Sequence, residues 1–354
     1  MRVQRRRRPY RLVATAVALA LGAATLSVAP AIEAEADIVY CNSMPRPVQN
    51  TVERIAGADR YATAVAVSKA GFAPRACNIY IASGTGYADA LAGAARASRM
   101  EESPVLLVKP NSIPAAVVAE IKRLRPSAIH VLGGSGAVSE AVVQQLSTLA
   151  ENHILRYVGS DRYATAAEID HGSAPVDTVY IASGQRFPDA LAGAPLAGRS
   201  RSPLLLVPST NGIPSSVKVR LSALSPKRIV MLGGPGAVSN AVASALRAYT
   251  SGPVTRLAGA DRFSTAVVIS KQIAAPGSNT VYITSGRDYP DALAIAPVAA
   301  LSWAPVLLVE RDSIPDVIGD ELRRLQPRHI VIVGGTGAVS ADVALQLEEY
   351  LVAP

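Results

Sequence analysis

Three arginines, each directly after an aspartate, are the residues of this sequence best suited to chemistry. They are Arg60, Arg162 and Arg262. The preceding aspartates, at positions 59, 161 and 261, lie 102 and 100 residues apart in copies of the pattern Gly-x-Asp-Arg-aromatic. A guanidinium can bind a carboxylate or a phosphate through two parallel hydrogen bonds. The pattern therefore predicts three equivalent contacts with anions.

The position of these arginines calls for a compensating negative charge. If Asp59 caps a helix, Arg60 falls in the first turn, where the helix dipole disfavours a cation by a few tenths of a kcal/mol or more. The other two copies share this arrangement. We expect each arginine either to pair with an aspartate, in its own repeat or across a repeat boundary, or to meet a polymer anion. Both arrangements can coexist.

Two further motifs recur in the same register. Asp-Ala-Leu-Ala begins at Asp89, Asp189 and Asp291, which we expect to be helix N-caps. Gly-Gly-x-Gly begins at residues 133, 233 and 334 and resembles a phosphate cradle, but it lacks the Gly-Lys-Ser/Thr of a P-loop. We therefore expect a tight turn with left-handed glycines, leading in the first copy to a helix capped by Ser139, and no cofactor.

Catalytic groupings are not evident in the sequence. The histidines, at positions 130, 153, 171 and 329, share no repeat register, and no Cys/His cluster predicts a metal site. Repeated Ser and Asp without a repeated base do not make a nucleophilic site. Aromatic residues are few and Trp303 is the only tryptophan, so carbohydrate binding by ring stacking has little support.

Strands and helices alternate within each copy and must position these motifs. In the first copy, strand-like segments at 78–82, 104–108 and 129–132 are separated by helical stretches. The segment 104–108 is continuously apolar, as expected of a strand that a parallel sheet buries on both faces. The succession favours right-handed βαβ units, and hence an α/β protein with a parallel sheet in each repeat.

The repeats define three predicted domains, at residues 51–152, 153–252 and 253–354. A period near 100 residues allows each domain its own core. Almost no linker separates the domains. Three equivalent surfaces favour a closed pseudo-threefold cluster over an open array, because closure buries the same surface of all three.

Residues 1–36 have the features of a secretory signal peptide. Six arginines precede an apolar run at residues 12–29, and the small-residue pattern Ala34-Glu35-Ala36 follows, with cleavage expected after Ala36. An uncleaved membrane anchor is the alternative, and both the general and the twin-arginine export routes fit. An arm at residues 37–50 follows and contains Cys41. A disulfide between Cys41 and Cys77 would suit an exported chain, with two free thiols as the alternative.

Much of the positive charge belongs to the predicted signal peptide. The formal net charge is +8, and removal of residues 1–36 leaves +4. No dense basic stripe follows Ala36, so a nucleic-acid partner is not expected. We also expect no membrane contact after cleavage.

Four repeated motifs together resemble the cell-wall-binding repeat 2 family of bacterial surface proteins. They are Gly-x-Asp-Arg-aromatic, Ser-Gly followed after four residues by Asp-Ala-Leu-Ala, Pro-aliphatic-Leu-Leu-Val, and Gly-Gly-x-Gly-Ala-Val-Ser, over residues 51 to 350. The resemblance implies Toprim-like modules clustered in threes. It also implies a secreted protein of the cell wall or cell surface, attached non-covalently through an anionic wall glycopolymer, with Arg60, Arg162 and Arg262 as candidate polymer-binding residues.

The Ile-Leu-Leu tripeptide of this family has no isoleucine here. The matching positions are Val105, Leu106, Leu107, Leu204, Leu205, Leu206, Val306, Leu307 and Leu308. We expect these residues to be buried in strands, with a structural role. Family members often carry a separate effector domain, which is not evident here, so an unidentified protein partner is a further expectation. We expect no enzymatic activity; a secreted cell-wall hydrolase, or another exported enzyme built on the same modules, is the alternative.

Overall fold

The computed structural model describes residues 50–352 apart from 101–102, 172–174 and 288–292. These residues belong to the compact unit Cys41–Pro354. The predicted signal peptide, Cys41 and the rest of the arm up to residue 49 lie outside the described residues. Within the described part of the chain, no helix is both long enough and apolar enough to cross a membrane.

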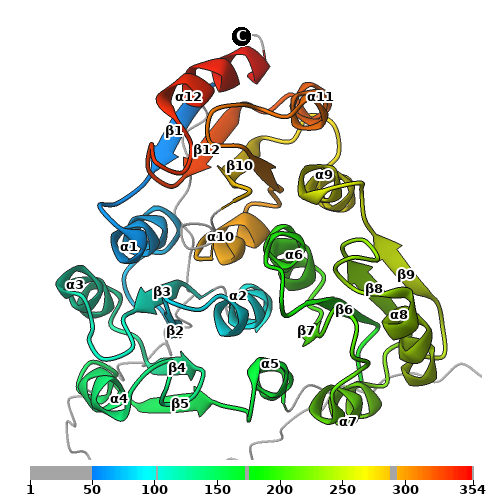
Figure 1. The fold of residues 1–354 in the computed structure, drawn as a ribbon. Coiled ribbons are helices and arrows are strands. Elements are labelled where there is room, and N and C mark those ends of the chain that lie inside the picture. The colour runs from blue at the N-terminus through cyan, green and yellow to red at the C-terminus, as the bar shows by residue number, and fades with distance from the viewer. Residues whose placement is uncertain (1–49, 101–102, 172–174, 288–292, 353–354) are drawn as a thin grey trace, which may run out of the picture. The chain divides into compact units, whose positions relative to one another are not determined.

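The described strands form three four-stranded sheets in which every pairing is parallel (Figure 1). The prediction of an α/β protein with parallel sheets is confirmed. The first sheet has the order β3 (Val105–Val108), β2 (Asn78–Ser83), β4 (Ala128–Leu132) and β5 (His153–Tyr157). The second has the order β7 (Leu204–Val207), β6 (Thr178–Ser183), β8 (Arg228–Leu232) and β9 (Val254–Leu257). The third has the order β11 (Val306–Val309), β10 (Thr280–Ser285), β12 (His329–Val333) and β1 (Thr51–Ile55).

Each sheet takes its fourth strand from the next repeat of the sequence. Strand β5 begins at His153, where the second predicted domain begins, yet it pairs with β4 of the first. Strand β9 likewise pairs with β8. The third sheet is completed by the first described strand, because β1 pairs with β12 in the register Thr51↔His329 to Ile55↔Val333. The sheets are therefore offset by one strand from the sequence repeats.

The helices follow the same threefold succession. In the first repeat they are α1 (Arg60–Gly71), α2 (Ala88–Met100), α3 (Ala115–Leu124) and α4 (Glu140–Ser147). In the second they are α5 (Arg162–Ile169), α6 (Pro188–Arg199), α7 (Ser215–Leu224), α8 (Asn240–Leu246) and the 3₁₀ turn η1 (Arg247–Tyr249). In the third they are α9 (Arg262–Ile273), α10 (Ile295–Leu301), α11 (Asp316–Leu325), α12 (Ala341–Leu347) and η2 (Glu348–Tyr350). Ser139 caps α4 through a hydrogen bond from Val142 N, as predicted.

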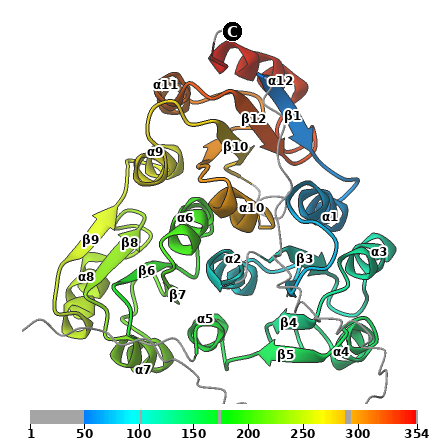
Figure 2. The ribbon, with the colours of Figure 1, turned by 180° about the vertical axis from the view of Figure 1, so that it is seen from behind.

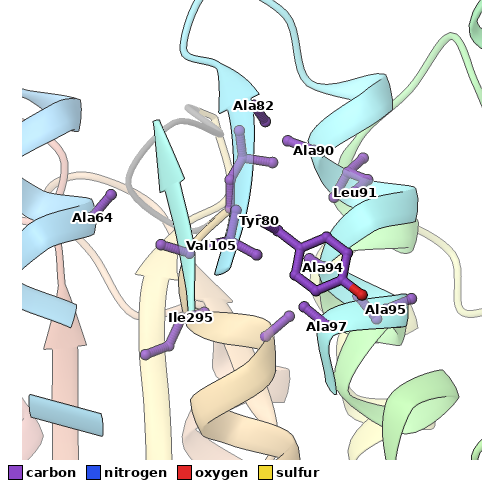
Figure 3. Close-up of a cluster of buried hydrophobic side chains, with 14 of the residues drawn as sticks. Ala64, Tyr80, Ala82, Ala90, Leu91, Ala94, Ala95, Ala97, Val105 and Ile295 are labelled. Carbon is purple, nitrogen blue, oxygen red and sulfur yellow. The ribbon is translucent and has the colours of Figure 1, made fainter. Parts of the chain in front are cut away.

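Helices α2, α6 and α10 pack against one another, one from each repeat (Figures 1 and 2). Small residues allow this close packing: a Cβ at Gly198 of α6 would overlap with Ser98 of α2. Figure 3 shows the alanines of α2 beside Tyr80, with Ile295 of α10 nearby. These residues belong to one buried cluster that extends over all three repeats.

The nine tripeptide residues lie in the edge strands β3, β7 and β11, and each side chain is at most 1% exposed. An edge strand is buried here because helices cover it: α1 packs on β3, α5 on β7 and α9 on β11. The tripeptides are thus core residues of the three sheets, and their side chains do not reach the surface.

Candidate binding sites at the repeat boundaries

Two cavities of matching construction lie where one repeat meets the next. The first has a volume of about 580 Å³ and the second about 680 Å³. The first is lined by Ser83, Thr85 to Asp89, Gly134, Gly136, Ala137, Gly159, Asp161, Arg162 and Thr165. The second is lined by Gln185 to Asp189, Gly234 to Ala237, Gly259 to Arg262 and Thr265. We call them the 1/2 and 2/3 boundary cavities.

Parallel strands explain why three motifs distant in sequence meet in each cavity. The segments after β2, β4 and β5 all leave the same edge of one sheet, where α/β proteins commonly bind ligands. One carries the Ser-Gly loop up to Asp89, one the Gly-Gly-x-Gly turn, and one the Asp161-Arg162 pair. The fourth motif is strand β3 itself, so it stays in the core.

Arg162 and Arg262 are exposed and line their cavities. Arg162 Nη1 donates a hydrogen bond of 2.7 Å to Gly184 O, which also accepts one of 3.2 Å from the Tyr87 hydroxyl of the preceding repeat. Arg262 bonds Gly286 O in the same way, and Arg60 Nη1 lies 2.6 Å from Gly84 O. Among the described residues none of the three arginines forms an ion pair, so the contact seen is with a backbone carbonyl.

The aspartate before each arginine caps the following helix. Asp161 Oδ1 accepts hydrogen bonds of 2.9 Å from Tyr163 N and 2.8 Å from Ala164 N. Asp59 and Asp261 cap α1 and α9 in the same manner. Each arginine therefore occupies the first helical position, as the sequence suggested.

Asp89 and Asp189 are not N-caps, so that prediction was wrong for both. Each is the second residue of its helix, after Ala88 in α2 and after Pro188 in α6, and Phe187 is the N-cap of α6. The sequence Asp-Ala-Leu-Ala does not distinguish these neighbouring positions. Asp291 lies outside the described residues.

Both aspartates are instead largely buried carboxylates within the cavities. Each lies against the first glycine of a turn, Gly133 or Gly233, where an added Cβ would overlap with the Oδ2 atom. These glycines have φ of +95° and +98°, which confirms the predicted left-handed turn. Burial raises the pKa of Asp89, and the charge of Arg162 opposes this rise. Burial raises the pKa of Asp189 to about 6, against the opposing effect of Arg262 and then Arg186.

A second set of arginines, absent from our sequence predictions, holds the turns in place. Arg256 Nη1 lies 2.6 Å from Gly233 O and Nη2 lies 2.8 Å from Val238 O. Arg156 donates to the equivalent carbonyls, from Nε to Gly133 O at 3.1 Å and from Nη2 to Val138 O. Arg54 Nη1 lies 2.8 Å from Gly334 O and Nη2 lies 3.1 Å from Ser340 O. The sequence contains a signal for this second set, because each of these arginines stands five residues before the aspartate of Gly-x-Asp-Arg in all three repeats.

Arg60 and the turn at Gly334 are the counterparts of these residues at the third boundary. The sequence counterpart of residues 86–90 includes 288–292, which lie outside the described residues, so no third cavity of this kind is described. No group of three or more His, Cys, Asp or Glu that could hold a metal ion occurs in the described parts of the chain. Because Cys41 is not described, its bridge to Cys77 stays a prediction.

The fold and the boundary cavities define an α/β repeat protein in which neighbouring repeats enclose cavities of matching construction. The sequence model of the family Cell wall binding domain 2 (CWB2) matches residues 54–143, 156–243 and 256–344. The chain therefore belongs to this family and carries three cell wall binding domains, as the sequence resemblance predicted.

Relatives and solved structures agree with this assignment. N-acetylmuramoyl-L-alanine amidase LytC of Bacillus subtilis (strain 168) is 29% identical over 303 residues, which are 86% of this chain and 59% of the amidase. The amidase enhancer of the same organism is 26% identical over 298 residues, which are 84% of this chain and 40% of the enhancer.

Among solved structures, Cwp6 from Clostridium difficile superposes with a TM-score of 0.78 at 25% identity, covering 86% of this chain and 48% of Cwp6. Cwp8 from the same organism gives 0.76 at 27% identity, covering 85% of this chain and 52% of Cwp8. The chain thus spans about half the length of the proteins that it matches.

Proposed function

We propose that this protein attaches non-covalently to the bacterial cell wall by holding an anionic wall glycopolymer in its boundary cavities. The observation that carries the proposal is that the same three motifs converge twice, each time with an exposed arginine at the start of a helix. A helix N-terminus favours anions, and a guanidinium offers five N–H donors, of which the bond to the glycine carbonyl uses one.

The acidic residues of the cavities oppose this attraction only in part. The charge of Asp161 is directed at backbone amides of α5, and that of Asp261 at an amide of α9. Burial favours the neutral form of Asp89 and Asp189. Below a pH of about 6, where Asp189 is protonated, an anion arriving from solvent therefore meets Arg262 with little competition from this carboxyl. Above that pH the charge of Asp189 opposes the anion.

Attachment through several weak sites would be strong in total. Arg60 marks a third equivalent position, and we propose that the Toprim-like modules form a pseudo-threefold cluster that presents all three arginines. Once one site holds a polymer, binding at the next is intramolecular, and avidity can exceed the affinity of a single site by roughly 10²-fold or more.

We propose no catalytic role for these domains and no role for a cofactor. The proposal places the mature protein outside the cell, at the wall, after removal of residues 1–36. An additional protein partner is compatible with this role.

Binding to purified walls, before and after removal of their anionic glycopolymers, tests the proposal. We expect wild-type protein to bind intact walls, to lose binding as salt rises, and to bind stripped walls poorly. The double variant R162Q/R262Q should retain its melting temperature and lose most of its binding.

The matched control is R247Q/R328Q, which removes the same charge from two exposed arginines outside both cavities. Equal binding by folded R162Q/R262Q and this control would reject the arginine sites. Equal binding to stripped walls would reject the anionic polymer.

A further inference from the structure

A third cavity lies at the other end of helix α6 from the 2/3 boundary cavity. It has a volume of about 380 Å³. Its floor is formed by buried Tyr180, Leu196 and Val230. The third repeat contributes Gln272 from α9 and Trp303 from the segment after α10, and Arg199 lies at the C-terminal end of α6.

This cavity exists because the second repeat lacks side chains that fill the same place in the first. There, His130 stacks between two tyrosines, with its ring centre 4.6 Å from that of Tyr80 and 5.8 Å from that of Tyr157. Arg96 covers Tyr157, with Cζ 5.4 Å from the ring centre. In the register of the repeats, the second repeat has aliphatic residues in place of His130, Tyr157 and Arg96: Val230, Leu257 and Leu196.

The cavity carries positive charge without a matching negative one. Arg199 forms no hydrogen bond or ion pair with another described residue, and its Nε atom is buried without a partner. Its guanidinium lies over the indole of Trp303, which is still 59% exposed. Arg228 also lines the cavity, and its lining includes no Asp or Glu. A buried donor that lacks a partner is costly, so an anion here would be stabilised.

We propose that this cavity binds one acidic sugar unit, a pyranose ring that carries a carboxylate or a phosphate. Arg199 would bind the acidic group, since arginine suits both. The apolar floor and the exposed indole would contact the C–H faces of the ring. Gln272, Thr255 and the Tyr180 hydroxyl supply donors and acceptors for sugar hydroxyls. A volume of about 380 Å³ is within the range of small-molecule sites.

This site is separate from the boundary cavities and stands on different residues. One tryptophan suffices for a single sugar unit, even though aromatic residues are too few for stacking to be the general mode of binding. Failure of this inference would therefore leave the proposed wall attachment unaffected.

Trp303 is the only tryptophan of the chain, so its fluorescence reports directly on this cavity. We expect glucuronic acid or glucose 6-phosphate to change the emission with a saturable curve, and glucose to have no such effect. The two acids distinguish a site for carboxylates from one for phosphates. R199Q should weaken binding at least about 10-fold, the effect of losing roughly 1.4 kcal/mol from a charged hydrogen bond.

R201Q is the matched control, because it removes a nearby exposed charge that does not line the cavity. It should bind like wild type. V230H/L257Y, which restores two rings of the first repeat, should fold and abolish binding. The proposal is overturned if neither acid gives a saturable change, if glucose acts equally, or if R199Q binds like wild type.

Discussion

Asp189 is a cavity residue whose protonation makes the stability of the fold depend on pH. Its carboxyl is largely buried beside Gly233, and Arg262 of the next repeat opposes the resulting rise of its pKa. The side chain is thus held at a place where its charge is unfavourable for the fold and for an arriving anion. Such strain is common where a structure is arranged for binding and not for stability alone.

We predict that D189N removes a pH-dependent loss of stability. The pKa of Asp189 is about 6 in the folded protein and near its ordinary value of 3.8 when unfolded. The folded state therefore binds more protons between these values, and stability falls as pH rises through about 6. Relative to D189N, wild type should gain up to about 3 kcal/mol in unfolding free energy between pH 7 and pH 4. Denaturant unfolding at several pH values measures this difference, and a constant difference would contradict the prediction.

At the scale of helices and strands, the sequence predicted the order of elements but not the membership of each sheet. Apolar runs such as Val105 to Val108 and caps such as Asp59 and Ser139 are local signals, and the structure places them as expected. A periodic sequence can be divided at any point of its period, so nothing in residues 153–157 reveals that they pair with β4 of the repeat before.

The site was predictable only in part for the same reason. Arg162 and the glycine turn were recognised separately, because each motif is local. Their meeting in one cavity depends on the offset of the sheets by one strand, which brings Arg162 to the sheet of the first repeat. The cavity beside Trp303 depends on differences between equivalent side chains, such as Val230 in place of His130. The sequence does not show that these side chains face the same space, so it does not predict the cavity.

Strand β1 gives a prediction at this scale. It completes the third sheet through five residue pairs, and Arg54 anchors the turn at Gly334. Deletion of residues 50–55 should expose the edge of β12 and speed hydrogen exchange of the backbone amides at 330–333. The amides of β2 and β6 should stay protected, because their sheets keep all four strands.

A synthetic peptide of residues 47–57, added in trans, should restore protection of β12 in the deletion variant. A peptide of the same composition in scrambled order is the control. Unchanged exchange of β12 after the deletion would show that β1 adds little to the third sheet.

At the scale of the whole chain, the three repeats share one buried cluster, and α2, α6 and α10 each contact the other two. Buried polar contacts also cross the first boundary. Arg99 of α2 forms an ion pair with Asp170, the residue after α5, and Arg96 Nη1 donates a 2.7 Å bond to Ile169 O. Removing one partner of a buried pair leaves the other uncompensated, so these contacts join the repeats strongly.

We predict that the mature chain behaves as one compact particle in solution. Small-angle scattering of residues 37–354 should give a radius of gyration of about 20 Å, the value expected for a single globule of this length. Thermal unfolding should show one transition, and R99A should lower its midpoint while R201A should not. A markedly larger radius, or separate melting of the repeats, would contradict the prediction.

The pairing of β1 with β12 also brings the beginning and the end of the described chain together in one sheet. Asn50 Nδ2 donates a 3.0 Å hydrogen bond to Val352 O, so the two ends of the described chain touch. A circular permutant that joins these ends and opens at residues 151–152, on the surface between α4 and β5, should keep every sheet intact. If one protein were fused to each end, the two fusion junctions would lie next to each other. Three wall-binding domains would then hold the two fused proteins side by side.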